Sequence, residues 1–173
     1  MSSHYETPLD AAAIVEAMNR HDVRYVVIDV FAAIAQQAPI PATRGIDLTP
    51  ETTVENLNRL SAALKELGAR IRTDAVEEGL SFDHHGSSLG RSAVWNLTCP
   101  HGEFDISFRP SGFEGGFGEL ALRAHKVSVG GTQVVIADLG DVIRSKEAAG
   151  RPKDLQVLPT LYRHQRSLRR DEE

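Results

Sequence analysis

Between residues 24 and 67 the sequence changes twice from a strand pattern to a helix pattern. Residues 24–28 end in a β-branched run typical of a buried strand, and residues 31–37 have the composition of a short helix. Residues 43–48 are predicted to form a second strand, and a long amphipathic segment follows it. Strands that alternate with helices in this way bury their apolar faces against one another. The pattern therefore predicts a mixed α/β (or α+β) fold.

The amphipathic segment is the most regular helix pattern in the chain. Thr52 and Glu55 fit a capping box at its start, and Gly68 is suited to end it. Its apolar residues recur at intervals of three and four, as one buried helix face requires. They are Val54, Leu57, Leu60, Leu64 and Leu67.

Further strands are expected in the second half of the chain. Residues 94–98 and 104–108 have strand patterns, and residues 126–136 resemble a hairpin around Gly130 and Gly131. Together with the two earlier strands they predict a sheet of about four to six strands.

Three more helices are predicted outside that sheet. One covers residues 9–19, after Pro8. A second is capped by Asp138 and ended by Gly150, and a third starts near Lys153.

The composition limits the organisation of the chain. With 173 residues and 41% hydrophobic content, one well-buried domain over residues 1–173 is expected. Its core is predicted at about residues 23–161, and residues 162–173 form a basic C-terminal helix or tail. There is no apolar run long enough to span a membrane and no basic-then-apolar leader, so we expect a cytoplasmic protein without a membrane partner. The formal net charge of -5 confines any nucleic-acid contact to a local patch such as residues 163–170.

Two aspartates are candidates for a metal site. In a strand over residues 43–48, Ile46 and Leu48 face one way and Asp47 faces the other. Two acids at positions i and i+2 of a strand would clamp a divalent metal, but here Gly45 stands at the first of them. Asp105 lies on the polar face of a later strand and can supply a second carboxylate. The alternative is that both acids are ordinary solvated strand residues.

A lysine on the apolar stripe of a helix also requires an explanation. Leu139, Val142 and Ile143 define the buried face of the predicted helix after Asp138, and Lys146 continues that stripe. The ammonium could reach a phosphate in a cleft, or it could extend to solvent near the helix C-terminus.

The order of these motifs resembles the minimal nucleotidyltransferases. The similarity is to the AbiEii-type toxin family, which includes the mycobacterial nucleotidyltransferase toxins, and it covers roughly residues 23–161. Members usually carry Gly-Gly or Gly-Ser where this chain has Asp29 and Val30, and Asp-x-Asp where it has Gly45, Ile46 and Asp47. The later motif of that family, a lysine followed by Arg-x-Lys-Asp, is intact in this chain. Its residues here are Lys146, Arg151, Lys153 and Asp154.

The resemblance implies transfer of a nucleoside monophosphate from an NTP to an RNA or protein acceptor. Asp47 and Asp105 would hold Mg²⁺ or Mn²⁺, and Lys146, Arg151, Lys153 and Asp154 would form the phosphate-binding region. Asp29 and Val30 would place negative charge and bulk where backbone amides normally approach phosphates. Catalysis is therefore expected to be impaired.

Two alternatives belong to other functional classes. In the first, the chain is a non-catalytic module that still binds nucleotide or RNA, including tRNA. In the second, it is a toxin or antitoxin component whose old cleft holds a partner protein. Independently of these alternatives, Arg151, Lys153 and Asp154 could be solvated turn charges with an aspartate at a helix start.

Overall fold

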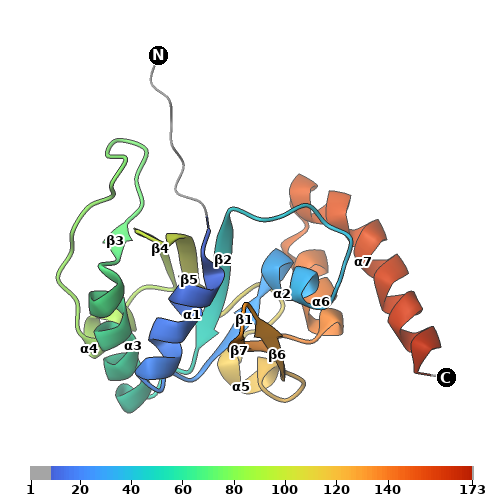
Figure 1. The fold of residues 1–173 in the computed structure, drawn as a ribbon, viewed down its shortest axis with the longest axis horizontal. Helices are drawn as coiled ribbons and strands as arrows, with labels where there is room; N and C mark the ends of the chain where they lie inside the picture. Colours follow the sequence, from blue (N-terminus) through green and yellow to red (C-terminus); the bar gives the residue numbers. More distant parts are fainter. Residues whose placement is uncertain (1–8, 173) are drawn as a thin grey trace.

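The computed structural model describes residues 9–172, which form seven helices and seven strands (Figure 1). The strands are β1 (Tyr25–Ile28), β2 (Gly45–Pro50), β3 (Arg70–Ile71), β4 (Val94–Cys99), β5 (Gly102–Ser107), β6 (His125–Val129) and β7 (Thr132–Ile136). The helices are α1 (Ala11–Arg20), α2 (Asp29–Ala35), α3 (Val54–Leu67), α4 (Gly86–Leu89), α5 (Phe117–Leu120), α6 (Leu139–Ala149) and α7 (Pro152–Asp171). None of the helices in this described part is both long and apolar enough to cross a membrane.

All seven strands belong to one mixed sheet with the order β3-β4-β5-β2-β1-β7-β6. β2 pairs antiparallel with β1 and parallel with β5, and β1 pairs parallel with β7. The predicted mixed α/β class is confirmed. The predicted number of strands was too low because β3 has only two residues, too few to show a period-two pattern.

The middle of the sheet separates an apolar face from a polar one. All four residues of β1 are buried, whereas the first four residues of β2 and all of β5 alternate between buried residues and half-buried or exposed ones. Ile46, Leu48, Phe104 and Ile106 are at most 1% exposed. Gly45, Asp47, Glu103 and Asp105 occupy the other face, as strand alternation requires.

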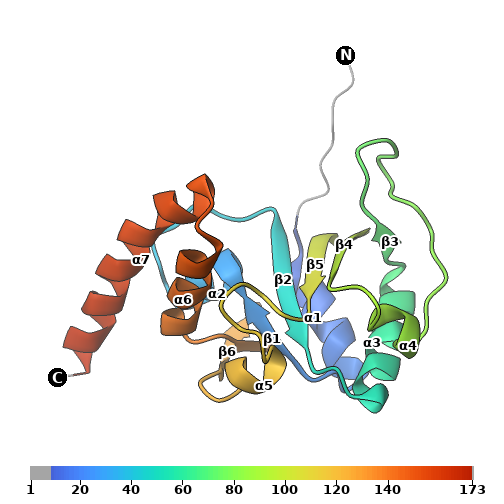
Figure 2. The ribbon, with the colours of Figure 1, turned by 180° about the vertical axis from the view of Figure 1, so that it is seen from behind.

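Helices α1 and α3 lie side by side on one face of the sheet, as Figures 1 and 2 show from opposite sides. On the far flank, α2 packs against β1 and β2 and against α6, which in turn packs against α7. The β2 strand is therefore next to α2, which connects it to α6 and α7.

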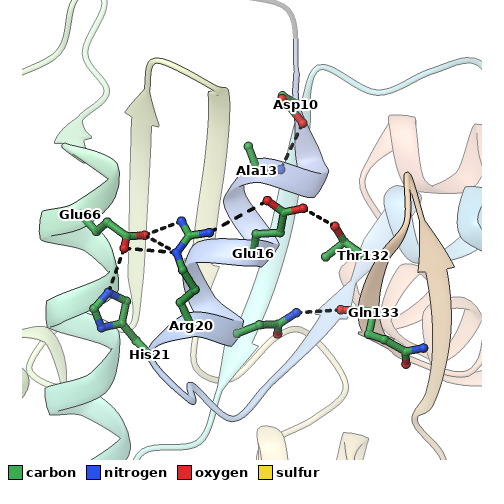
Figure 3. Close-up of polar contacts among 9 residues, drawn as sticks. Asp10, Ala13, Glu16, Arg20, His21, Glu66, Thr132 and Gln133 are labelled. Carbon is green, nitrogen blue, oxygen red and sulfur yellow. Dashed lines mark hydrogen bonds and ion pairs between the residues drawn. The ribbon is translucent and has the colours of Figure 1, made fainter.

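Polar contacts attach α1 to its neighbours on both sides (Figure 3). Arg20 donates to Glu66 of α3 at 2.6 Å, and Thr132 of β7 donates to Glu16 at 2.6 Å. Asp10 caps the helix by accepting from the amide of Ala13 at 3.1 Å. These contacts fix α1 across the sheet between α3 and the β6–β7 hairpin.

The helix ends largely follow the predicted capping residues. Gly68 and Gly150 end α3 and α6 in the left-handed conformation, with φ of 64° and 60°. Asp138 caps α6 through the amide of Gly140. The predicted capping box at Thr52 was wrong by one residue, because Thr53 is the N-cap and its hydroxyl accepts from Asn56.

Asn56 holds the adjacent ends of β1 and β2 to the first turn of α3. Its side chain is 0% exposed, accepts from the amide of Arg24 at 2.7 Å, and donates to the carbonyls of Arg24 at 2.9 Å and Glu51 at 2.7 Å. The residue before β1 and the residue after β2 are therefore both hydrogen-bonded to one buried side-chain amide.

Replacing Asn56 with alanine should lower the free energy of unfolding by about 3 kcal/mol, since three buried backbone groups lose their partner. Chemical denaturation measures this loss, with Arg59→Ala on the exposed side of α3 as the control. The control should change stability by at most about 0.5 kcal/mol. Equal losses in the two variants would show that Asn56 does not have this role.

Candidate functional site

The polar face of the sheet brings the two predicted metal-binding aspartates together. Asp47 of β2 lies directly opposite Asp105 of β5 in the parallel pair. On its other side Asp47 is paired with Ile28, the last residue of β1, so Asp29 follows immediately beside it. Asp47 therefore lies between two other aspartates, Asp29 and Asp105, whose charges act on it.

A small open pocket of about 160 Å³ lies on the Asp105 side of this group. Its floor is the β2–β5 pair, and its rim includes one cation. The lining residues are Thr43, Gly45, Asp47, Arg72, Glu103, Phe104 and Asp105. Because Gly45 has no side chain, the pocket extends over the position where the first acid of an Asp-x-Asp pair would project.

Asp47 has the most perturbed carboxyl group of the site. Burial, and after it the neighbouring charges of Asp29 and Asp105, raise its pKa to about 7 against the opposing effect of Lys146. This carboxyl therefore holds its proton to a much higher pH than an ordinary aspartate does. Negative charge has accumulated here beyond what the nearby cations compensate.

Asp29 adopts a backbone conformation that favours glycine. Its φ is +66°, in the left-handed region that L residues other than Asn and Asp seldom occupy. Its Oδ1 accepts from the amide of Val30 at 2.8 Å and also forms an ion pair with Lys146. The carboxylate therefore binds both a backbone amide in the first turn of α2 and the ammonium of Lys146.

Lys146 is buried, as the apolar stripe of α6 predicts, with 6% of its surface exposed. Its Nζ donates to Oδ1 of Asp154 at 3.0 Å and also contacts Asp29. The ammonium does not extend to solvent, so that alternative was wrong. It lies between two carboxylates instead.

Asp154 anchors this cluster at the start of α7 and is 0% exposed. Burial alone would raise its pKa, but hydrogen bonds from Arg151 and Lys146 outweigh that effect and hold the pKa at about 2. Arg151 donates its Nε at 2.7 Å and its backbone amide at 3.1 Å. Asp154 is therefore ionised at neutral pH, and it is not the solvated helix start of the alternative interpretation.

The predicted phosphate-binding residues thus separate into two groups. Lys146, Arg151 and Asp154 form one connected cluster that reaches Asp29. Lys153 is exposed on the first turn of α7 and makes no ion pair with the residues that the structure describes.

Arg72 and Glu103 were not among the predicted site residues. Arg72 donates to Oδ1 of Asp105 at 2.9 Å, and it lies 3.8 Å from Oε2 of Glu103. β3 ends at Ile71 and places the next residue, Arg72, beside Asp105, but a strand of two residues shows no period-two pattern that could have predicted it.

Asp47 and Asp105 together offer two carboxylate ligands for a metal. Across residues 9–172 no three His, Cys, Asp or Glu side chains are grouped closely enough to hold an ion. Hard divalent cations prefer carboxylate oxygens, and the excess negative charge around Asp47 fits such a cation. The residues present therefore fit a metal site with two protein ligands.

No family model matches the chain, and no curated protein matches it. Among the solved structures that it resembles are two with TM-scores above 0.5. A candidate nucleotidyltransferase from Thermotoga maritima has a TM-score of 0.53 and 14% identity, with 88% of this chain and 89% of that chain covered. The chain has the nucleotidyltransferase fold. ANT(2″)-Ia in complex with adenylyl-2″-tobramycin has a TM-score of 0.51 and 14% identity, with 86% and 83% covered.

The raised pKa of Asp47 predicts a stability that depends on pH. Because the folded state holds this proton more tightly than the unfolded state, stability falls as pH rises from about 4 and the full cost is present above about 7. The shift corresponds to at most about 4 kcal/mol. Asp47→Asn should therefore raise the free energy of unfolding by at least about 1 kcal/mol at pH 8 and change it little at pH 4.

Denaturant unfolding of both proteins at several pH values between 4 and 8 measures this difference. Asp74→Asn, at an exposed acid away from the pocket, is the matched control and should follow the wild-type curve. An Asp47→Asn variant with the wild-type pH dependence would contradict the assignment.

Proposed function

We propose that this protein is a nucleotidyltransferase whose catalysis is impaired by the residues at positions 29, 30 and 45. Its parent reaction is the transfer of a nucleoside monophosphate from an NTP to an acceptor hydroxyl. The fold, the paired Asp47 and Asp105, and the buried Lys146 beside them support this proposal.

The ion pair between Asp29 and Lys146 is the observation that carries the proposal. A nucleotide phosphate at this place would need a free ammonium and a free backbone amide. Here one oxygen of Asp29 contacts both Lys146 and the amide of Val30. An incoming phosphate must displace that oxygen and tolerate the charge of the same carboxylate. The side chain of Asp29 therefore blocks the phosphate site.

The metal side of the site is reduced as well. Asp47 and Asp105 would hold Mg²⁺ or Mn²⁺, and a bound ion would supply charge neutralisation at the transferred phosphate. Gly45 leaves the cation one carboxylate short. Such a loss weakens transition-state stabilisation more than it weakens binding, because binding tolerates an absent ligand better.

The backbone does not require the departures at positions 29 and 45. Gly45 lacks a positive φ, and a Cβ there would lie 3.2 Å from the carbonyl oxygen of Glu103, which a shift of a few tenths of an ångström relieves. At position 29 a glycine would fit φ of +66° better than the aspartate does. The backbone is therefore compatible with the motif residues that are absent.

On the resemblance to the AbiEii-type family, we further propose that the parent activity is that of a toxin nucleotidyltransferase acting in the cytoplasm. RNA, including tRNA, or a protein hydroxyl would be the acceptor, and the cognate antitoxin would be the protein partner. Lys153, which is exposed in the first turn of α7, is available to contact such an acceptor.

Restoring the motif tests the proposal. The triple variant Asp29→Gly, Val30→Gly and Gly45→Asp should raise nucleotide transfer by at least about a hundredfold, since a released phosphate site and an added metal ligand each contribute several kcal/mol. Incorporation of α-³²P-labelled ATP, CTP, GTP and UTP into total small RNA, and into the protein itself, measures transfer with MgCl₂ or MnCl₂ present.

The matched control carries Gly45→Asn in place of Gly45→Asp, because asparagine has the size of the missing acid without its charge. The control should bind NTP and transfer slowly. No gain in the triple variant, or an equal gain in the control, would contradict an impaired metal-dependent nucleotidyltransferase.

A further inference from the structure

Arg72 lies at the edge of the candidate site on the opposite side from Lys146. Its amide donates to the carbonyl of Asn96 at 2.9 Å, which extends the β3–β4 ladder by one residue. Asn96 is in turn paired with Asp105, and Asp105 with Asp47. Arg72 therefore lies in the same row across the sheet as the two carboxylates, and it lines the pocket beside them.

The guanidinium of Arg72 is fixed at three points. One terminal nitrogen donates to Oδ1 of Asp105 at 2.9 Å, and the other donates to the carbonyl of Leu97 at 3.1 Å. The second nitrogen also lies 3.8 Å from Glu103. The hydrogen bond to the carbonyl of Leu97 orients the guanidinium of Arg72, so that its other terminal nitrogen faces Asp105.

We propose that Arg72 sets the divalent-cation affinity of this site by acting as a competing counter-ion for Asp105. The inference rests on the proposed function, because it takes Asp47 and Asp105 as the metal-binding pair. In the metal-free protein the guanidinium neutralises one of the two ligands. A divalent cation must weaken the Arg72–Asp105 contact and remain beside the displaced positive charge.

Because position 45 has no acid, the charge of Arg72 has a larger effect on the affinity for metal. With a third carboxylate, the positive charge of one arginine would be a smaller part of the local balance. With only two ligands, like-charge repulsion between guanidinium and metal opposes much of the attraction that remains. Arg72 and Gly45 therefore both lower the affinity for metal, by different means.

Mn²⁺ binding to the full-length chain tests this role without any assay of activity. Calorimetry, together with the electron paramagnetic resonance signal of free Mn²⁺, gives the Kd for the wild type and for Arg72→Gln. Removal of the competing charge should lower the Kd at least tenfold. Adding Asp105→Asn to Arg72→Gln should abolish that gain.

Arg70→Gln is the matched control, because Arg70 is two residues away and donates to the carbonyl of Gly79 outside the pocket. It should bind Mn²⁺ as the wild type does. Arg72→Lys retains the positive charge and should also stay near the wild-type Kd, which separates charge from folding. Circular dichroism and thermal melting establish that each variant is folded.

Equal or weaker Mn²⁺ binding by a folded Arg72→Gln variant would overturn this inference while leaving the proposed function intact. Absence of Mn²⁺ binding in every variant, Arg72→Gln included, would overturn the metal site and this inference together. A tenfold gain that persists with Asp105→Asn would place the metal elsewhere and would also overturn it.

Discussion

The buried carboxylate of Asp154 is the group on which the site depends. An ionised group without solvent must be paired, and its pKa of about 2 shows how strongly Lys146 and Arg151 stabilise the charge. This requirement joins the end of α6 to the start of α7 and holds Lys146 inside the protein. Lys146 can then reach Asp29, so the geometry of the proposed phosphate site depends on one interaction between α6 and α7.

On both sides of the candidate site, the acidic side chains form ion pairs with basic side chains of the same chain. Lys146 and Arg151 face Asp29 and Asp154 on one side, and Arg72 faces Asp105 on the other. Asp47, between them, retains excess negative charge and a raised pKa. A nucleotide with its metal would supply the same two kinds of charge, a phosphate for Lys146 and a cation for Asp105. In the proposed function, the internal ion pairs therefore take the places that substrate and metal would take.

Much of this arrangement could be predicted from local patterns. Alternation placed Asp47 and Asp105 on one polar face, and the apolar stripe of α6 showed that Lys146 is buried. Other features depend on contacts between distant segments. The pairing of Asp29 with Lys146 requires α2 to pack on α6, and Arg72 reaches Asp105 only through a strand of two residues. No spacing within the sequence encodes either contact.

The central claim is that the Asp29 carboxylate occupies the phosphate site. Its most direct test is a calorimetric titration of the wild type and of Asp29→Asn with each NTP in the presence of Mg²⁺. Asparagine keeps the shape and tolerates the left-handed backbone, but it removes the charge. The account predicts at least tenfold tighter binding by Asp29→Asn for one or more of the nucleotides. Equal affinity of the two proteins for all four would contradict it.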